Sequence, residues 1–156
     1  MALVRILVDG YSLLHRWPEL ARGAPRFSAA ARDELVRRLT QYQDAISTPI
    51  TIFFDGAMPK GKRRGPEGDP GIEVLFSHSG QTADDLIERA AYRFAPYGEV
   101  LAVTDDGAER ETVLSLGGLA SSCINFIREV ENTLAALADD IKDHNRREQH
   151  RFRNRR

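Results

Sequence analysis

The chain has 156 residues and a formal net charge of −1, and 42% of its residues are hydrophobic and 29% charged. This length suits one domain with a sizeable core, and the composition argues against a disordered chain. No apolar run approaches the roughly 20 residues of a membrane span, and the N-terminus lacks a signal-peptide pattern, so we expect no membrane contact. A single cysteine, Cys123, excludes an internal disulfide and a cysteine-based zinc site and fits a cytoplasmic location.

Charge is unevenly distributed along the chain. Residues 142–156 hold seven Lys/Arg and two Asp/Glu, a net charge of +5, so the remaining chain carries −6. We therefore expect a folded domain over residues 1–141 and a basic C-terminal helical extension or tail over residues 142–156. The basic segment suggests contact with a polyanion. The alternative is a solvated, frayed end.

Strand and helix patterns alternate along the first half of the chain. Hydrophobic periodicity and capping residues predict a strand over residues 3–9 and a helix over 28–47. A second strand is predicted over 50–56, a loop over 57–71 and a third strand over 72–77. The loop is rich in Gly, Pro and basic residues. The helix is expected to begin at the capping residue Ser28.

The alternation continues in the second half. A helix, a fourth strand and a further helix are predicted over residues 82–94, 99–106 and 107–116. "LASS" (119–122) allows a short edge strand, and a last helix opens at Ser122 with an apolar face that ends near Leu137. These elements predict an α/β fold, a three-layer sandwich whose central, mainly parallel sheet of 4–5 strands has helices on both faces.

Acidic residues follow three of the predicted strands. Asp9 ends the first strand, Asp55 the second and Asp105-Asp106 the fourth, while Asp84 lies in the first turn of the helix after the third. If the first and fourth strands are neighbours, these carboxylates meet at the carboxyl edge of the sheet and repel one another. A divalent cation would relieve that repulsion, and oxygen ligands favour Mg²⁺ or Mn²⁺.

Each acid also has a structural explanation. Asp-Gly is a common turn pair, and acids favour the first turn of a helix. Helix phase separates Asp84 from Asp85: Thr82 and Asp85 fit a capping box, so Asp84 is expected to face the sheet. Glu88 is expected on the wetter side of that helix, together with Asp85.

The segments "ILVDGYSLL", "FSHSGQTAD" and "VTDD", with "ITIFFDG" and "SSCINFIREVE" in the same order, resemble the YacP-like branch of the NYN domains in the PIN-like nuclease superfamily. The resemblance covers nearly the whole chain. It implies a PIN-like fold and a metal-dependent acidic site that cuts RNA. Members include a ribosome-associated endoribonuclease that cleaves messenger RNA, so single-stranded RNA and the ribosome are the partners that the resemblance implies.

Carried over by position, Asp9, Asp84 and Asp106 match the catalytic, metal-binding acids of the family, and Asp55 matches a further acid. Thr104 matches the threonine before Asp106. Ser12 stands where the family usually has Asn, and offers one donor in place of two, to a substrate phosphate or to a neighbouring carboxylate. Asp105 either adds charge at the metal site or lies in solvent.

The expected function is hydrolysis of phosphodiester bonds in single-stranded RNA by a metal-activated water. Substrate affinity is expected from basic loop residues and the C-terminal arginines, and Tyr11 either stacks on a base or packs beneath the loop. The basic loop residues are Lys60, Lys62, Arg63 and Arg64. Two alternatives remain: a non-catalytic RNA- or ribosome-binding module with a degenerate site, and a small-molecule phosphoryl-transfer enzyme.

Overall fold

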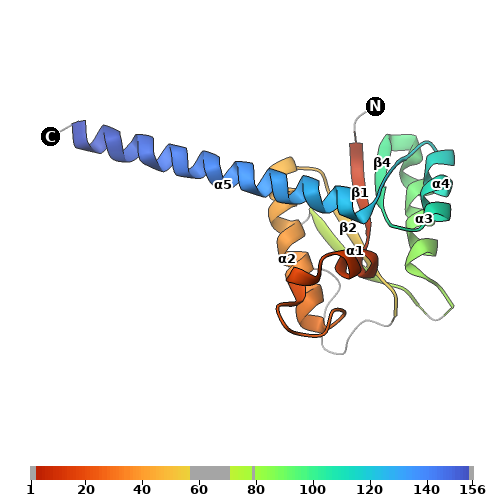
Figure 1. Cartoon of the computed structure of the whole chain (residues 1–156). Coiled ribbons are helices and arrows are strands. Elements are labelled where there is room, and N and C mark those ends of the chain that lie inside the picture. The colour runs from red at the N-terminus through yellow and green to blue at the C-terminus, as the bar shows by residue number, and fades with distance from the viewer. Residues whose placement is uncertain (1–2, 57–70, 79, 155–156) are drawn as a thin grey trace.

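The alternating strands and helices form one five-stranded sheet (Figure 1). The computed structural model describes residues 3–56, 71–78 and 80–154. The spatial order of the strands is β3-β2-β1-β4-β5, and every neighbouring pair is parallel. The strands are β1 (Leu3–Asp9), β2 (Ile50–Phe54), β3 (Ile72–Phe76), β4 (Glu99–Val103) and β5 (Leu119–Ser121). The predicted α/β fold with a parallel central sheet is confirmed.

Helices cover both faces of this sheet. Alternate residues of β1 point in opposite directions: Ile6 and Val8 pack with α1, α2 and α5, whereas Leu7 packs with α3 and α4. Two separate hydrophobic cores therefore lie on either side of the sheet, which makes three layers. The helices are α1 (Gly10–Arg16), α2 (Ala29–Ile46), α3 (Ala83–Phe94), α4 (Gly107–Ser115) and α5 (Cys123–Asn154), with short 3₁₀ turns at Pro18–Ala21 and Ala95–Tyr97.

The direction of the chain connections reverses beside β1. The connection from β1 to β2 contains α1 and α2, on one face, and the connection from β3 to β4 contains α3, on the other. β1 pairs with β2 on one side and with β4 on the other, and Val8 lies opposite Ile52 and Val103. Parallel sheets bind ligands at the carboxyl ends of the strands where the connections diverge in this way. The strand arrangement thus places the ends of β1 and β4 at the expected binding edge.

The helix α1 was not predicted from the sequence. It follows β1 without a loop, and Asp9 caps it by accepting a hydrogen bond from the backbone N–H of Ser12 at 3.2 Å. Its first residue, Gly10, is buried, and a Cβ atom at this position would overlap the ring of Phe54 on β2. Glycine is therefore required here by the close approach of α1 to β2.

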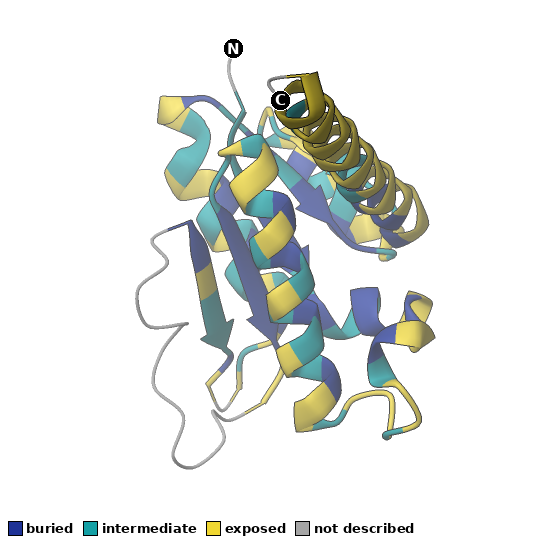
Figure 2. Cartoon of the chain, turned by 90° about the vertical axis from the view of Figure 1, so that its left-hand side faces the viewer, coloured by how far each residue is buried: buried dark blue, intermediate teal, exposed yellow. Residues whose placement is uncertain are grey.

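The C-terminal helix α5 is 32 residues long and extends well beyond the sheet (Figure 1). Its buried residues end at Val130, and Leu134 is the last residue that packs against the core. Leu137, predicted to lie on the packed face, is 42% exposed. From residue 135 to residue 154 every side chain except Glu148 is exposed, as the outer part of the helix in Figure 2 shows. About 30 Å of helix therefore stands clear of the body.

Part of the basic segment is helical. The predicted boundary between a domain and its extension, at residue 142, falls inside the continuous helix α5, and that division stays a prediction. Among residues 3–56, 71–78 and 80–154, none of the helices combines the length and the apolar character needed to cross a bilayer. The predicted loop over 57–71 lies outside the described residues except for Gly71.

The close contact at Gly10 gives a stability prediction. We expect Gly10→Ala to lower the free energy of unfolding by about 1–3 kcal/mol, because the added methyl group must displace the Phe54 ring in a filled core. Urea unfolding followed by circular dichroism measures this. Gly107→Ala, at the open first position of α4, is the matched control and is expected to be neutral or slightly stabilising. Equal stabilities for the two variants would contradict the prediction.

Candidate active site

Four carboxylates gather at the carboxyl edge of the sheet, around β1. Asp9 ends β1, Asp55 follows β2, and Asp106 follows β4 as the N-cap of α4. Asp84 lies in the first turn of α3, which packs on β1 and β4. β1 and β4 are neighbours, which is the condition on which the expected meeting of these acids rests.

The charges of these acids act most strongly on Asp84. Burial, followed by the charges of Asp9, Asp106 and Asp55, raises the pKa of Asp84 to about 6. Its Oδ1 atom is buried and accepts no hydrogen bond from any described residue. Burial also raises the pKa of Asp9, against the hydrogen bonds from Ser12, and Asp55 adds to the increase. A buried carboxylate oxygen without a donor is costly, so this site favours a proton or a cation.

Helix caps fix the positions of three of these acids. Asp106 Oδ1 accepts hydrogen bonds from the backbone N–H groups of Ala108 and Glu109, at 2.9 and 3.3 Å. Asp55 Oδ1 accepts one from the N–H of Ala83 at 2.5 Å and so holds the start of α3. Asp9 caps α1 in the same way. Because helices anchor these side chains, their charges cannot move apart to reduce the repulsion.

The predicted phase of α3 is correct for its first turn. Thr82 and Asp85 form the expected capping box, with reciprocal hydrogen bonds of 3.2 and 3.1 Å. Asp84 is thereby turned toward the other acids. Glu88, expected on the wetter side of α3, is half-buried, and its side chain lies near enough to Glu109 of α4 to raise the pKa of that carboxyl.

Glu109 is a site residue that the sequence reasoning missed. Its side chain is only 4% exposed, and its Oε1 atom has no hydrogen-bond partner among the described residues. Burial, hydrogen bonding with Glu88 and the charges of Asp84, Glu88 and Asp106 raise its pKa to about 8. Helix phase could have identified it, because Glu109 lies one turn before the buried Val113 and on the same face of α4.

Thr104 and Ser12 support the acids directly. Thr104 is fully buried, and its hydroxyl accepts a hydrogen bond from the backbone N–H of Asp106 at 3.2 Å. The backbone N–H and the side chain of Ser12 both hydrogen-bond with Asp9. Of the two partners expected for the Ser12 hydroxyl, the structure therefore shows the neighbouring carboxylate.

Asp105 lies outside the acidic cluster. It accepts hydrogen bonds from the guanidinium of Arg16 at 2.9 Å and from the backbone N–H of Cys123 at 3.0 Å. Burial would raise its pKa, but these bonds and the charge of Arg16 outweigh burial and lower the pKa. The expectation that Asp105 either charges the metal site or lies free in solvent is thus wrong, because it joins α1 and α5 to the end of β4.

The remaining predicted residues are Tyr11 and four basic residues of the loop after β2. Tyr11 packs against Phe27 and Phe54, with ring centroids 5.4 and 5.0 Å away, and its hydroxyl accepts a hydrogen bond from Arg32. This arrangement corresponds to packing, the second of its two expected roles. The four basic residues predicted to bind substrate, Lys60, Lys62, Arg63 and Arg64, lie outside the described residues.

The donor set suits a hard divalent cation. Its ligands would be carboxylate oxygens, one of them the partnerless Oδ1 of Asp84, and such ligands favour Mg²⁺ or Mn²⁺. Within residues 3–56, 71–78 and 80–154, no Lys or Arg forms an ion pair with Asp9, Asp84 or Asp106. In the same residues, no three His, Cys, Asp or Glu side chains are already arranged to hold a metal ion. Binding would therefore require side-chain rotations that bring the carboxylate oxygens closer while the capping hydrogen bonds are kept.

The raised pKa of Asp84 predicts how stability depends on pH. A carboxyl whose pKa rises on folding destabilises the folded state once it ionises, so this contribution worsens as pH increases from about 4 to about 6. Without metal, we expect Asp84→Asn to raise the free energy of unfolding by about 1–2 kcal/mol at pH 7.5 and to change it little at pH 4. Urea unfolding in EDTA at both pH values measures the effect.

Asp85→Asn is the matched control, because it removes one charge from the same helical turn. Its exposed side chain belongs to the capping box, so we expect slight destabilisation at pH 7.5. An Asp84→Asn variant that is less stable than the unmodified chain at pH 7.5 would show that Asp84 is not strained by its neighbours.

Similar proteins identify the family of this chain. The YacP-like NYN domain family matches residues 6–156. The uncharacterized protein YacP of Bacillus subtilis (strain 168) is 29% identical over 127 residues, which cover 81% of this chain and 74% of YacP. A crystal structure of Bacillus subtilis Rae1 (YacP) superposes with a TM-score of 0.73 at 25% identity, covering 92% of this chain and 81% of that chain. Its W164L mutant gives the same TM-score at 26% identity, covering 89% and 81%. With this fold and this match, the chain belongs to the YacP-like NYN domain family, whose fold is nuclease-like.

Proposed function

We propose that this protein is a metal-dependent endoribonuclease that hydrolyses phosphodiester bonds in single-stranded RNA. The observation that carries the proposal is the partnerless, buried Oδ1 of Asp84, surrounded by the charges of Asp9, Asp106 and Asp55. Such an arrangement destabilises the folded state, because the carboxylates repel one another and the loss of any one of them would reduce that repulsion. Sites that stabilise a cation and a reacting phosphate require it, and the family suggests nuclease activity.

Asp9, Asp84 and Asp106 would hold Mg²⁺ or Mn²⁺, with Asp55 nearby. When bound, the metal lowers the pKa of a coordinated water and offsets charge on the leaving oxygen. The protein supplies fixed positions: α1 and α4 hold Asp9 and Asp106 through their caps, and Thr104 secures the turn before α4. The hydrogen bonds from Ser12 favour the ionised form of Asp9 and so oppose the effect of burial.

Substrate affinity in this proposal comes from positive charge away from the acids. The acidic cluster repels a phosphate backbone until a cation is bound, so basic residues must supply the attraction. Lys60, Lys62, Arg63, Arg64 and the basic residues of 142–156 are the candidates named from the sequence. Ribosome association, which the family resemblance implies, belongs to the same proposal.

A second reading is a non-catalytic RNA- or ribosome-binding module. One observation favours it: no three acids among the described residues are arranged as a preformed metal site. The resemblance adds that Ser12 stands where the family usually has Asn. Such a module would keep the basic surfaces but not the cation requirement. Cleavage and cation binding therefore separate the two readings, whereas RNA binding alone does not.

Replacing the central acid tests catalysis. In Mn²⁺ with labelled single-stranded RNA, we expect cleavage by the unmodified protein and a loss of about a hundredfold or more in Asp84→Asn, because the buried oxygen no longer carries a charge. Denaturing gel electrophoresis measures the rate. Asp85→Asn is the matched control and should retain activity. Asp9→Asn and Asp106→Asn can still accept the capping hydrogen bonds, so their loss of activity would not reflect loss of folding.

Thermal unfolding gives an independent readout of the same site. Mn²⁺ at about 100 times its dissociation constant should stabilise the unmodified protein by about 2.7 kcal/mol and Asp84→Asn far less. Undiminished cleavage by Asp84→Asn would refute the assignment of the acids. Unchanged thermal midpoints together with no cleavage would support the non-catalytic module.

The exposed end of α5 predicts a salt-dependent contribution to RNA binding. Removing residues 142–156 takes away seven basic residues and leaves every core contact intact, because packing ends at Leu134. We expect weaker RNA binding, a shallower dependence of log Kd on log salt and an unchanged urea midpoint. Fluorescence anisotropy between 50 and 200 mM KCl, the range over which such contacts weaken about a thousandfold or more, measures this. Equal affinity at low salt would show that the segment is only a solvated end.

A further inference from the structure

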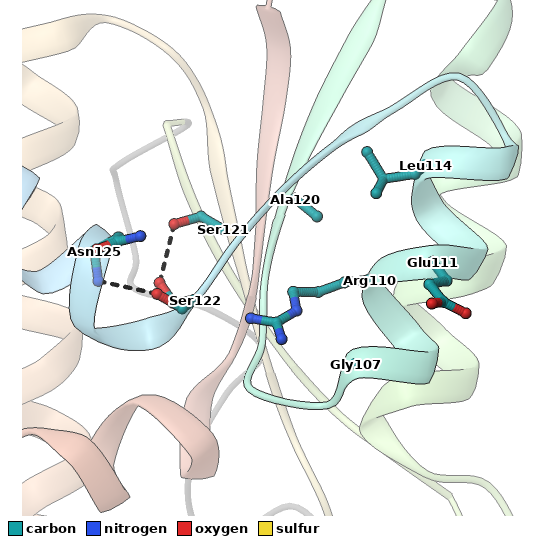
Figure 3. Close-up of a pocket in the computed structure, with 8 residues that line it drawn as sticks. All are labelled: Gly107, Arg110, Glu111, Leu114, Ala120, Ser121, Ser122 and Asn125. Atoms are coloured by element: carbon teal, nitrogen blue, oxygen red, sulfur yellow. Dashed lines mark hydrogen bonds between the residues drawn. The ribbon is translucent and has the colours of Figure 1, made fainter.

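A polar pocket lies on the opposite side of α4 from the acidic cluster. It has a volume of about 470 Å³ and is bounded by α4, by β5 and by the first turn of α5 (Figure 3). Gly107 and Ser121 contribute to its lining, one just after Asp106 and the other at the carboxyl end of β5. The pocket therefore opens at the same edge of the sheet as the acids, one helix away from them.

The pocket presents donors and one positive charge. Arg110 extends from α4 toward the connection between β5 and α5, where Ser121 and Ser122 lie, as Figure 3 shows. The Arg110 side chain is half-buried, and it forms no ion pair with any residue in the described part of the chain. Asn125 adds a side-chain amide on the first turn of α5. The Ser121 hydroxyl already donates to the Ser122 carbonyl, which leaves the Ser122 hydroxyl as a donor. A guanidinium group with an amide and this hydroxyl nearby matches a phosphate group.

The remaining lining suits a nucleotide unit better than a bare ion. Leu114 and Ala120 form an apolar part of the wall, and Leu114 is 53% exposed. A base or ribose could cover this apolar surface while its phosphate binds Arg110. The volume lies in the range of about 300–1,000 Å³ typical of small-molecule sites. Glu111, the one acid of the lining, points away from Arg110 in Figure 3.

Helix α4 separates opposite charges on its two sides. Glu109 faces the acidic cluster, and Arg110, the next residue, faces the pocket. The N-terminus of α4 begins at Gly107, between the two sites. An extended strand lying across this helix end would place one phosphate near Asp106 and another near Arg110. The acids alone repel RNA, so a phosphate held one helix away would position the strand without filling the acidic site.

We propose that this pocket, through Arg110 and Asn125, binds a nucleotide of single-stranded RNA next to the bond that the acids address. The inference rests on the proposed function for its substrate class, but binding can be measured without cleavage. It differs from the contribution of the basic C-terminal segment, because these residues lie at the sheet edge and not on the exposed part of α5.

A pair of isosteric variants on one helix tests the pocket. Asn125→Asp places a negative charge in it, and Asn132→Asp makes the same change two turns along α5 at an exposed site outside the lining. The probe is a short fluorescein-labelled oligouridylate in EDTA, followed by anisotropy. We expect Asn125→Asp to weaken binding about tenfold, the loss of one charge-assisted hydrogen bond, and Asn132→Asp to weaken it less than twofold. An acid near a helix N-terminus favours folding, so instability cannot account for the loss.

Removing the guanidinium gives a second comparison. Arg110→Ala should weaken binding about tenfold and reduce the slope of log Kd against log salt by about 0.7, the value for one phosphate contact in a single strand. Arg128→Ala, at an exposed site on α5 outside the pocket, is the matched control. Arg110→Lys keeps the charge but not the planar guanidinium, so its affinity for the oligouridylate should lie between those of Arg110→Ala and Arg128→Ala.

The outcomes separate this inference from the proposed nuclease function. Equal losses for the pocket and control variants, or no binding of the oligouridylate by the unmodified protein, would overturn the pocket. Pocket-dependent binding by a protein that cleaves no RNA in Mn²⁺ would support the pocket and refute the nuclease. Cleavage that is lost in Asp84→Asn but unaffected by Arg110→Ala at limiting RNA would leave the nuclease standing and refute the pocket.

Discussion

Repulsion among carboxylates at one edge of the sheet is the constraint on which this structure depends. Asp84 carries a buried oxygen with no donor, and Asp9, Asp55 and Asp106 act on it from three other elements. The fold sustains this cost because the acids are attached where they cannot separate: at the end of a central strand and at the first turns of helices. Burial of apolar side chains in the two cores on either side of the sheet offsets the stability lost at this edge.

Two further acids, Glu109 and Glu88, extend the cluster on the side of α4. Glu109 is nearly inaccessible and pairs with Glu88, and the two extend the negative charge from Asp84 along the contact between α3 and α4. The raised pKa of Glu109 favours its protonated form, which limits the net charge of the region. A proton on Glu109 and, in the proposed function, a cation held by Asp9, Asp84 and Asp106 are two ways to relieve the same repulsion.

The sequence was sufficient for the strands and for the direction of Asp84, but not for the order of the strands in the sheet. Alternating patterns identified four strands and allowed the fifth, and the capping box at Thr82 and Asp85 determined which acid of the Asp-Asp pair faces inward. It was not sufficient for α1, because Asp-Gly is typical of a turn, and only the contact of Gly10 with Phe54 shows why a helix starts there. Glu109 was missed because a glutamate is ordinarily assigned to the wet side of a helix. Asp105 was misjudged because its partners, Arg16 and Cys123, are distant along the chain.

The length of α5 beyond the core has a geometric meaning. A flexible basic tail would present its charge as an average over many positions, and would only increase the local concentration of a polyanion. A helix instead holds Arg146, Arg147 and Arg151 at set separations from the sheet, on a rod whose near end is joined to β4 through Asp105. A polymer bound at the far end of such a rod can reach the carboxylates only with segments at a set distance along the polymer. The helix would therefore select a position on a bound polyanion as well as attract it.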